Sequence, residues 1–389
     1  MLHKPIPFRL YLTRFNYQQL ILRELRTKSS NRYTQRNGED DELKIRNPIE
    51  NQEDRLYFHK SKGQHILTNQ RILDSIVRKS NINPNDTVLE IGPGTGNLTL
   101  KLLEVSKKVF AIELDKRMED ILNKRVAERG FKDKLTVIWK DALKAEFTQF
   151  DLVVANIPYG ISSPLVAKLV YGTNHFRSAT LLLQKEFAKR LLANPGDSEF
   201  NRLAVNVKLV ADVEFVMDVS RRDFVPCPKV DSSVVIIRPK ADIPKVNLDE
   251  WLAFTRTCFG KKNKTLGAIF KQKKKVIELL RLSKKMGPIN ENVEMGDCCG
   301  CSEEDDDERE SEGEDFYSSS CSELEASSFK EKIIEVLKSG GFEDKRPSKL
   351  SHELLLHLLS SFNQAGIIFH DQTEQKNAGN TAFAASYNS

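Results

Sequence analysis

A glycine-rich turn between an apolar strand and a helix most constrains the fold of this chain. An apolar stretch from Val88 runs into Gly92, Gly94 and Gly96, and a helix is expected directly afterwards. Glycine has no Cβ, so its backbone can turn tightly and come close to a ligand. The spacing is G-x-G-x-G, which differs from the G-x-G-x-x-G of pyrophosphate-binding dinucleotide folds. The turn predicts an α/β fold whose parallel sheet binds a ligand at the carboxyl ends of its strands.

Polar residues stand at the ends of the strands that follow. Glu113 closes the next expected strand, where an acidic side chain is placed to bind a ribose diol. Asp141 follows the third strand and is a candidate acceptor for an adenine amino group. Taken singly, each acid is equally well interpreted as a solvated carboxylate. The ordered set of glycine turn, Glu113, Asp141 and Asn156 at four successive strand ends predicts a nucleoside site.

The fourth strand ends in the tetrapeptide Asn156-Ile157-Pro158-Tyr159. The Asn156 side-chain oxygen can accept a hydrogen bond from an exocyclic NH2 group. Pro158 has no N–H and favours an extended Ile157, which can aim the Ile157 carbonyl outward. Tyr159 offers a face on which a base can stack. The group predicts a site for an amino-purine, and the alternative is a strand followed by a proline-initiated turn.

Together these segments resemble the ribosomal RNA adenine N6,N6-dimethyltransferases, the bacterial KsgA enzyme and its nucleolar and mitochondrial relatives. Two further segments agree. Residues 60–67 (KSKGQHIL) match the family's N-terminal cofactor-covering motif, and residues 224–234 (FVPCPKVDSSV) match its Phe-x-Pro-x-Pro-Lys-Val-Asp-Ser motif. His65 stands where bacterial members usually carry Asn, and the chain is similar to the eukaryotic branch there. The chain as a whole resembles the plant mitochondrial member of that branch. The resemblance covers residues 58–285, with a tail match over 329–369.

The resemblance implies a Rossmann-like class I methyltransferase sheet of seven mostly parallel strands, followed by a smaller helical domain. It implies S-adenosyl-L-methionine as cofactor and adenosine N6 of small-subunit rRNA as the methyl acceptor. The implied cofactor-binding residues are His65, Leu67, Gly92, Gly94, Gly96, Glu113, Asp141 and Asn156. The implied catalytic residues are Asn156, Ile157, Pro158, Tyr159 and Phe224. Phe224 would sandwich the flipped base with Tyr159. The other interpretation is packing under the turn at Pro226, and both roles can hold together.

Alternating apolar and helical stretches predict the order of the sheet and its helices. Strands are expected at 88–92, 108–113, 135–140, 150–155, 179–184, 213–219 and 232–238. Helices are expected at 98–103, 116–128, 163–171 and 186–193. No long helix separates the last two strands, so we expect a hairpin and one antiparallel strand.

Shifts in composition divide the chain into six parts. They are a targeting leader and disordered segment (1–55), the methyltransferase domain (56–240), a basic helical part of the C-terminal domain (241–285), an acidic disordered insertion (286–325), a second helical part (326–370) and a disordered tail (371–389). The two helical parts together form one small domain in this interpretation.

Charge is strongly segregated along the chain. Residues 297–315 hold eleven acids and one base, whereas residues 260–285 hold ten Lys or Arg and one acid, Glu278. A basic run of that density is typical of nucleic-acid binding, although a solvated helix face is the general alternative. Downstream of a methyltransferase motif set, the run favours rRNA or the pre-ribosomal small subunit as partner. We expect a monomer.

The first 36 residues predict the compartment. They contain eight Lys or Arg and one acid, Glu24, with interleaved aromatic residues such as Phe8 and Phe15. An arginine-rich, acid-poor, amphipathic leader is typical of a mitochondrial presequence, so we expect the mitochondrial matrix. The alternative is a basic RNA-binding or nucleolar extension, which would make precursor 18S rRNA the substrate. No apolar run approaches the roughly 20 residues of a membrane span, so no membrane partner is expected.

Two other function classes stay open from the residues alone. A protein with this fold can serve as a ribosome-assembly or mitochondrial transcription factor, but the turn and the Asn156 tetrapeptide are both intact here. An NAD-linked oxidoreductase is disfavoured by the glycine spacing. Cys298, Cys299 and Cys301 lack a nearby second pair or His ligand, so we expect reduced thiols and no metal.

Overall fold

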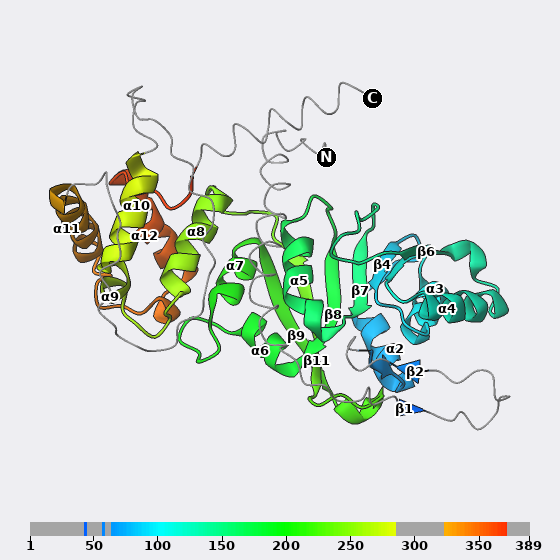
Figure 1. The fold of residues 1–389 in the computed structure, drawn as a ribbon. Helices are drawn as coiled ribbons and strands as arrows, with labels where there is room; N and C mark the ends of the chain where they lie inside the picture. The colour runs from blue at the N-terminus through cyan, green and yellow to red at the C-terminus, as the bar shows by residue number, and fades with distance from the viewer. Residues whose placement is uncertain (1–42, 45–56, 59–63, 285–322, 372–389) are drawn as a thin grey trace, which may run out of the picture. The chain divides into compact units, whose positions relative to one another are not determined.

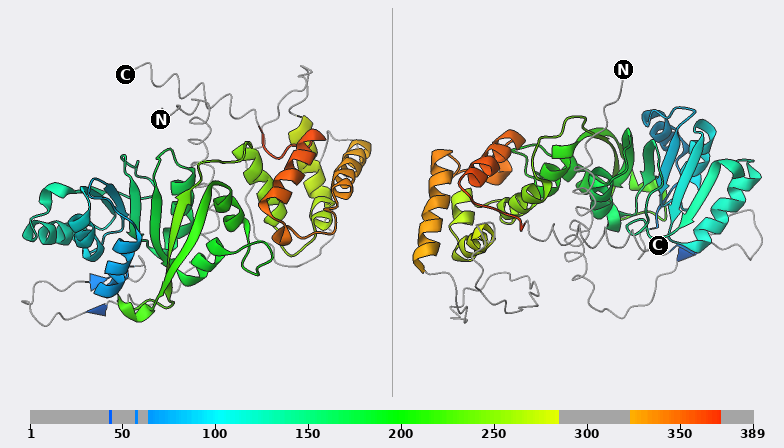
Figure 2. Two further views of the ribbon diagram at one scale, coloured as in Figure 1. Left: turned by 180° about the vertical axis from the view of Figure 1, so that it is seen from behind. Right: turned by 90° about the horizontal axis from the view of Figure 1, so that it is seen from above.

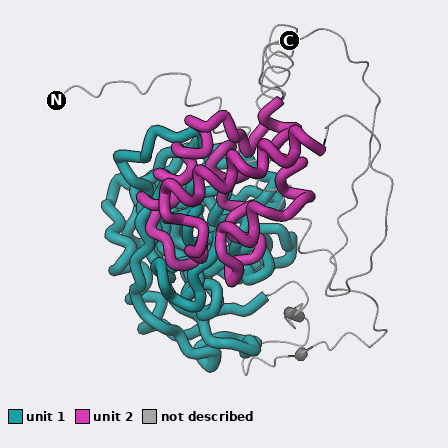
Figure 3. The backbone as a smooth tube through the Cα atoms, turned by 90° about the vertical axis from the view of Figure 1, so that its left-hand side faces the viewer, with its two compact units in different colours: residues 1–248 teal, residues 249–389 magenta. Residues whose placement is uncertain are grey.

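The computed structural model describes residues 43–44, 57–58, 64–284 and 323–371 (Figure 1). The chain divides into two compact units, residues 1–248 and 249–389 (Figure 3). Most of the expected leader and tail, and the acidic insertion up to residue 322, lie outside the described residues. Within the expected leader, β1 (Leu43–Lys44) pairs antiparallel with β2 (Tyr57–Phe58).

Unit 1 is built on one seven-stranded sheet (Figure 1). Its strands are β4 (Thr87–Ile91), β5 (Lys108–Glu113), β6 (Leu135–Trp139), β7 (Leu152–Asn156), β8 (Ser178–Gln184), β9 (Ala211–Val219) and β11 (Ser232–Pro239). They are ordered β6-β5-β4-β7-β8-β11-β9. Only β11 runs antiparallel to its neighbours β8 and β9. The predicted seven-stranded sheet with one antiparallel strand is confirmed.

Helices alternate with these strands and cover both faces of the sheet (Figure 2). They are α2 (Gln70–Lys79), α3 (Asn97–Val105), α4 (Lys116–Glu128), α5 (Ser162–Tyr171), α6 (Lys185–Leu192) and α7 (Arg202–Val210). Successive residues of a strand point to opposite faces of the sheet, and Val88 and Leu89 of β4 are both buried. Both faces of the sheet therefore carry apolar side chains that helices shield from water. Helices α2 and α7 were not among the helices predicted from sequence.

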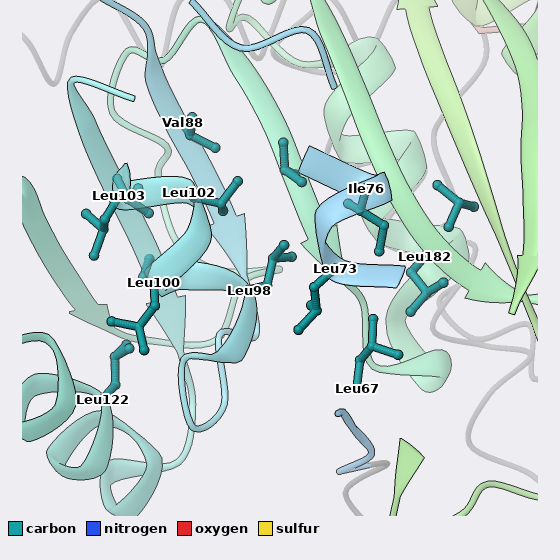
Figure 4. Packing of buried hydrophobic residues seen from close by; sticks show 14 of the residues in the cluster. Leu67, Leu73, Ile76, Val88, Leu98, Leu100, Leu102, Leu103, Leu122 and Leu182 are labelled. Atoms are coloured by element: carbon teal, nitrogen blue, oxygen red, sulfur yellow. The ribbon is translucent and has the colours of Figure 1, made fainter. Parts of the chain in front are cut away.

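One hydrophobic cluster fixes the strand–turn–helix that carries the glycines (Figure 4). Leu98 and Leu102 of α3 pack with Leu73 of α2 and with Val88 of β4. Each fully buried leucine contributes about 1.5–3 kcal/mol of transfer free energy. The turn between β4 and α3 is therefore held at both ends by buried side chains.

A short two-stranded sheet joins two segments that are far apart in sequence. Strand β3 (Ile66–Leu67) pairs antiparallel with β10 (Phe224–Val225). The side chain of Asn69, which caps α2, donates to Asp223 at 2.7 Å in the turn before β10. The two outlying family motifs seen in the sequence thus meet beside the carboxyl ends of the main strands.

Unit 2 is helical around an aromatic core. Its helices are α8 (Leu248–Phe259), α9 (Leu266–Phe270), α10 (Lys273–Lys284), α11 (Glu323–Ser339) and α12 (His352–Gln364). The ring of Phe270 lies 5.0 Å from that of Phe362, and Phe254 lies 5.2 Å from Phe369. Helix α11 begins inside the segment 286–325 that was expected to be disordered. No helix in the described part of the chain is both long and apolar enough to span a membrane.

Candidate active site

A cavity of about 300 Å³ opens at the carboxyl ends of β4, β5, β6 and β7. Its size is at the lower end of the range for small-molecule sites, about 300–1,000 Å³. Ten of the predicted site residues line it: His65, Leu67, Gly92, Gly94, Glu113, Asp141, Asn156, Ile157, Pro158 and Tyr159. Gly96 and Phe224 are not among the residues that line it. The structure therefore brings together most of the predicted set, drawn from five separate segments.

The glycine turn packs directly against the Asn-Ile-Pro-Tyr segment. Gly92 has a φ of +70°, and a Cβ there would lie 3.3 Å from the Cδ of Pro158. Gly94 has a φ of +56°, which also favours glycine. Gly96 caps α3 with a φ of +87°, and a Cβ there would lie 2.5 Å from Leu122. The glycine at position 92 thus allows the turn to lie against Pro158, whereas Gly96 allows α3 to pack against α4.

Glu113 is held by three backbone N–H groups at the end of β5. One carboxylate oxygen accepts from Gly94 at 3.1 Å, and the other accepts from Leu114 at 2.8 Å and from Asp115 at 2.9 Å. Burial raises the pKa of Glu113, and the three hydrogen bonds partly oppose that rise. The carboxylate is thereby fixed to both the glycine turn and the start of α4, with lone pairs left for a ligand hydroxyl.

Asp141 opens a tight turn after β6. One of its carboxylate oxygens accepts from the backbone N–H of Leu143 at 2.9 Å. Its backbone carbonyl accepts from Lys144 at 2.9 Å and from Ala145 at 2.8 Å. Asp141, Ala142 and Leu143 all line the cavity, so this turn forms one of its walls.

Asn156 is the last residue of β7, and its side-chain amide contacts His65 in the N-terminal motif, residues 60–67. Its Nδ2 donates to the backbone carbonyl of His65 at 3.0 Å. Because the nitrogen is used in this way, Oδ1 is the side-chain atom that remains to accept a hydrogen bond in the cavity. His65 is itself held, since its Nδ1 donates to the carbonyl of Pro226 at 2.8 Å.

Tyr159 is fixed on two sides. Its hydroxyl lies 2.8 Å from the Ser232 hydroxyl, and its ring stacks on His65 with centroids 5.8 Å apart. Burial raises the pKa of Tyr159, so the phenol stays protonated near neutral pH. The preceding Ile157 is anchored through its N–H to the carbonyl of Leu182 at 3.3 Å.

Phe224 is buried in the core and is not among the residues that line the cavity. Its side chain is 2% exposed and belongs to the hydrophobic cluster that also contains Leu67, its strand partner across β10 and β3. This placement corresponds to the packing alternative raised from the sequence. Contact of Phe224 with a base stays a prediction, as do the ligand roles of the other site residues.

Sequence reasoning missed Glu90, which also lines the cavity. It is 1% exposed, and its Oε2 has no hydrogen-bond partner among the described residues. Burial raises the pKa of Glu90 to about 8, and the nearby charge of Glu113 adds to the rise. An acid inside an otherwise apolar strand, Val88 to Ile91, was the available signal. In the described ranges no cluster of three or more His, Cys, Asp or Glu is arranged to hold a metal.

Comparison with known proteins identifies the family. The family described as "Ribosomal RNA adenine dimethylase" matches residues 55–300. The "Ribosomal RNA small subunit methyltransferase, mitochondrial" of Arabidopsis thaliana is 63% identical over 365 residues, 94% of each chain. A "Probable dimethyladenosine transferase" of Dictyostelium discoideum is 44% identical over 80% of this chain and 91% of its own.

A solved structure agrees in sequence and in fold. The crystal structure of a dimethyladenosine transferase from Plasmodium falciparum superposes with a TM-score of 0.65 at 40% identity. The match covers 78% of this chain and all of that one. With the sheet order and the cavity described above, these matches confirm the resemblance seen in the sequence. The chain belongs to the ribosomal RNA adenine dimethylase family, whose members are methyltransferases.

Proposed function

We propose that this protein transfers methyl groups from S-adenosyl-L-methionine to N6 of adenosine in small-subunit rRNA. The observation that carries the proposal is the hydrogen bond from Asn156 Nδ2 to the His65 carbonyl. It orients the amide so that Oδ1 can accept from an adenine amino group beside the glycine turn. The tetrapeptide and the turn are both intact, which supports an enzyme over a binding protein that has kept only the fold.

The charge of the cavity supports a cationic cofactor. The residues that line it include one base, Lys140, and three acids besides Glu90, namely Glu113, Asp115 and Asp141. Glu90 adds little charge near neutral pH, because burial raises its pKa to about 8. A sulfonium compound is favoured in such surroundings, whereas the pyrophosphate of NAD is disfavoured. Glu113 would hold the ribose hydroxyls, Asp141 the adenine amino group, and the backbone of Gly92 and Gly94 would lie against the amino-acid end.

When bound, the cofactor supplies an electrophilic methyl group on a positively charged sulfur. The residues of this chain supply position rather than acid–base chemistry. The Asn156 side chain and the Ile157 carbonyl accept the two N–H bonds of adenine N6, which favours a tetrahedral nitrogen and turns its lone pair toward the methyl. Orientation of this kind can supply about 7–11 kcal/mol of a reaction barrier.

The base must leave its stack to reach the cavity. Tyr159 would then support it, and the contacts of Tyr159 with His65 and Ser232 keep the ring in place before the base arrives. A pre-positioned aromatic ring costs less entropy on binding than a free one. The methyl leaves the sulfur as the N–C bond forms, and the positively charged amine then loses a proton to solvent. Only one N–H is left on the neutral amine, so the second transfer loses one of the two hydrogen bonds.

The substrate and compartment rest on the relatives and on the leader. The Arabidopsis relative is named as a mitochondrial enzyme of the small ribosomal subunit. The basic leader of this chain fits the same compartment, so we propose the mitochondrial matrix and the mitochondrial small-subunit rRNA. The nucleolar enzyme acting on 18S rRNA is the alternative that the experiment must separate.

The test uses full-length protein, labelled S-adenosylmethionine and two transcripts, one for each small-subunit rRNA. Mass spectrometry of the digested RNA should show N6,N6-dimethyladenosine in the mitochondrial transcript. Product only in the cytoplasmic transcript would move the substrate to 18S rRNA. If dimethyladenosine is found neither in the two transcripts nor in assembled small subunits, the proposed methyltransferase activity is contradicted. Calorimetric titration with S-adenosylmethionine and with NADH separates the methyltransferase from the oxidoreductase.

A further inference from the structure

Lys168 is a buried cation behind the wall of the cavity. It lies on α5, its residue is 7% exposed, and its Nζ donates to three backbone carbonyls of one turn. The acceptors are Ala142 at 2.8 Å, Leu143 at 3.1 Å and Ala145 at 2.5 Å. An ammonium group has three N–H donors, so one lysine can bind all three carbonyls at once.

The turn held by Lys168 is the one that presents Asp141. Ala142 and Leu143 line the cavity together with Asp141, while their carbonyl oxygens face the ammonium. The Asp141 carboxylate is in turn held by the N–H of Leu143. Movement of this turn would therefore move the Asp141 carboxylate with it.

Helix α5 also connects the Asn156–Tyr159 segment with the 141–145 turn. It begins at Ser162, directly after the turn η3 (Tyr159–Ile161) that follows Pro158. Lys168 stands on the same helix and reaches the turn after β6. One rigid element thus supports both the segment proposed for the base and the wall proposed for the cofactor.

We propose that Lys168 is a positioning residue for the cofactor, which holds the 141–145 turn so that Asp141 and its neighbours fit the nucleoside. The inference rests on the proposed function, because it assigns the nucleoside end of S-adenosylmethionine to this wall. A cation is suited to this task because carbonyl dipoles attract it and because it can bind three of them at once. The ring of Phe147, 4.2 Å from Nζ, adds a cation–π contact.

The environment of Lys168 is costly for a charge. Burial lowers the pKa of Lys168 to about 8, while the charges of Asp141 and Glu146 raise it and that of Lys140 lowers it. An apolar side chain would avoid this cost but would leave three inward-facing carbonyls without a donor. The turn would then rearrange, and the cavity wall with it.

The number of donors on the side chain can be varied in steps. Lys168→Gln keeps two N–H donors and Lys168→Met keeps none. Lys208→Met is the matched control, because Lys208 Nζ donates in the same way to the carbonyls of Leu192 and Ala193, which do not line the cavity. This control removes a lysine that binds carbonyls in a similar way, but it leaves the residues that line the cavity unchanged.

The experiment measures the dissociation constant of S-adenosylhomocysteine by calorimetry on full-length protein, together with steady-state methylation. We expect Lys168→Met to weaken binding by about tenfold or more, Lys168→Gln to weaken it less, and Lys208→Met to leave it unchanged. At saturating S-adenosylmethionine the Lys168 variants should keep most of their turnover, so the effect appears in KM. Backbone amides of residues 143–145 should exchange faster in Lys168→Met, because their hydrogen bonds to Asp141 loosen.

Unchanged affinity in folded Lys168→Met, or an equal loss in Lys208→Met, would overturn the inference. If Lys168→Met does not fold, Lys168→Gln decides by the same two measurements. Failure of the wild-type protein itself to bind S-adenosylhomocysteine or S-adenosylmethionine is a different result, because it removes the proposed function along with the inference built on it.

Discussion

Asn156 donates a hydrogen bond from its side-chain nitrogen to the backbone carbonyl of His65, 3.0 Å away and 91 residues earlier in the chain. The bond ties the end of β7 to residues 64–67, which also line the cavity. It also decides which end of the amide is available to a substrate. A single asparagine thus donates to the His65 carbonyl and keeps an acceptor oxygen, which an aspartate could not do without losing the donor.

The first prediction follows from that bond. Asn156→Ala should reduce turnover by about 100-fold or more, because it removes an acceptor aimed at the reacting amine. Affinity for S-adenosylhomocysteine should change only a few-fold. Asn174→Ala is the matched control, since Asn174 Nδ2 also donates to a backbone carbonyl, that of Phe147, outside the cavity. Wild-type turnover in Asn156→Ala would show that the residue is only structural.

The second prediction concerns Glu113. Glu113→Gln should weaken S-adenosylmethionine binding by roughly 10- to 150-fold, the equivalent of a charge-assisted hydrogen bond worth about 1.5–3 kcal/mol. The amide NH2 would also face one of the backbone N–H groups now bound to the carboxylate, so we expect lower thermal stability. Glu104→Gln, an exposed change on α3, serves as control. Equal affinities in the two variants would contradict the ribose assignment.

The third prediction is a pH effect from Glu90. Burial raises its pKa from 4.5 to about 8, so between these pH values the folded protein keeps a proton that the unfolded chain has lost. The folded state binds more protons there, so stability falls as the pH rises through this window. In thermal unfolding, the stability of Glu90→Gln relative to the wild type should increase as the pH rises from about 5 to 8. Above pH 8 the difference in stability should change little. A constant difference at every pH would mean that Glu90 ionises normally.

The fourth prediction refines the basic run of unit 2. Lys271 forms an ion pair with Glu343, and Lys275 forms one with Glu278 at 2.6 Å, whereas Lys273 and Lys274 are exposed at the start of α10. Reversing the charge of the latter two should weaken RNA binding. It should also flatten the slope of log affinity against log salt by about 1.4–1.8, if each lysine contacts one phosphate.

The control for that experiment lies on α11. Lys330→Glu with Lys332→Glu makes the same change in charge at two exposed positions of the same unit. If both double variants flatten the salt dependence equally, the effect is one of net charge, and the α10 lysines are a solvated face.

The fifth prediction concerns the leader, most of which lies outside the described residues. Residues 1–50 fused to a fluorescent reporter should direct it to mitochondria, because a basic amphipathic leader is drawn toward a compartment that is negative inside. Replacing Arg9, Arg14 and Arg23 with Gln should abolish import. Nuclear or nucleolar fluorescence of the unchanged fusion would move the substrate to cytoplasmic-ribosome precursor RNA without altering the chemistry.

Local patterns determined much of this protein. Apolar strands that end in glycine, Glu113, Asp141 and Asn156 predicted both the sheet and the edge at which the cavity-lining residues gather. The reason is physical, because buried parallel strands are continuous apolar runs and their carboxyl ends meet at one edge. Helices α2 and α7 were not singled out from the sequence, although they are about as long as α3 and α6, which were predicted.

Only the tertiary structure decided which side chains face the cavity and which support it. Phe224 stands in a family motif, yet its ring is buried with Leu67, because the pairing of β3 with β10 is formed between segments more than 150 residues apart. In the sequence, Glu90 is only one residue of an otherwise apolar strand. The folded sheet brings it to the wall of the cavity. In the sequence, Lys168 is not distinguished from the other lysines. Its three carbonyl partners lie 23 to 26 residues away, and local sequence patterns do not predict contacts between separate elements.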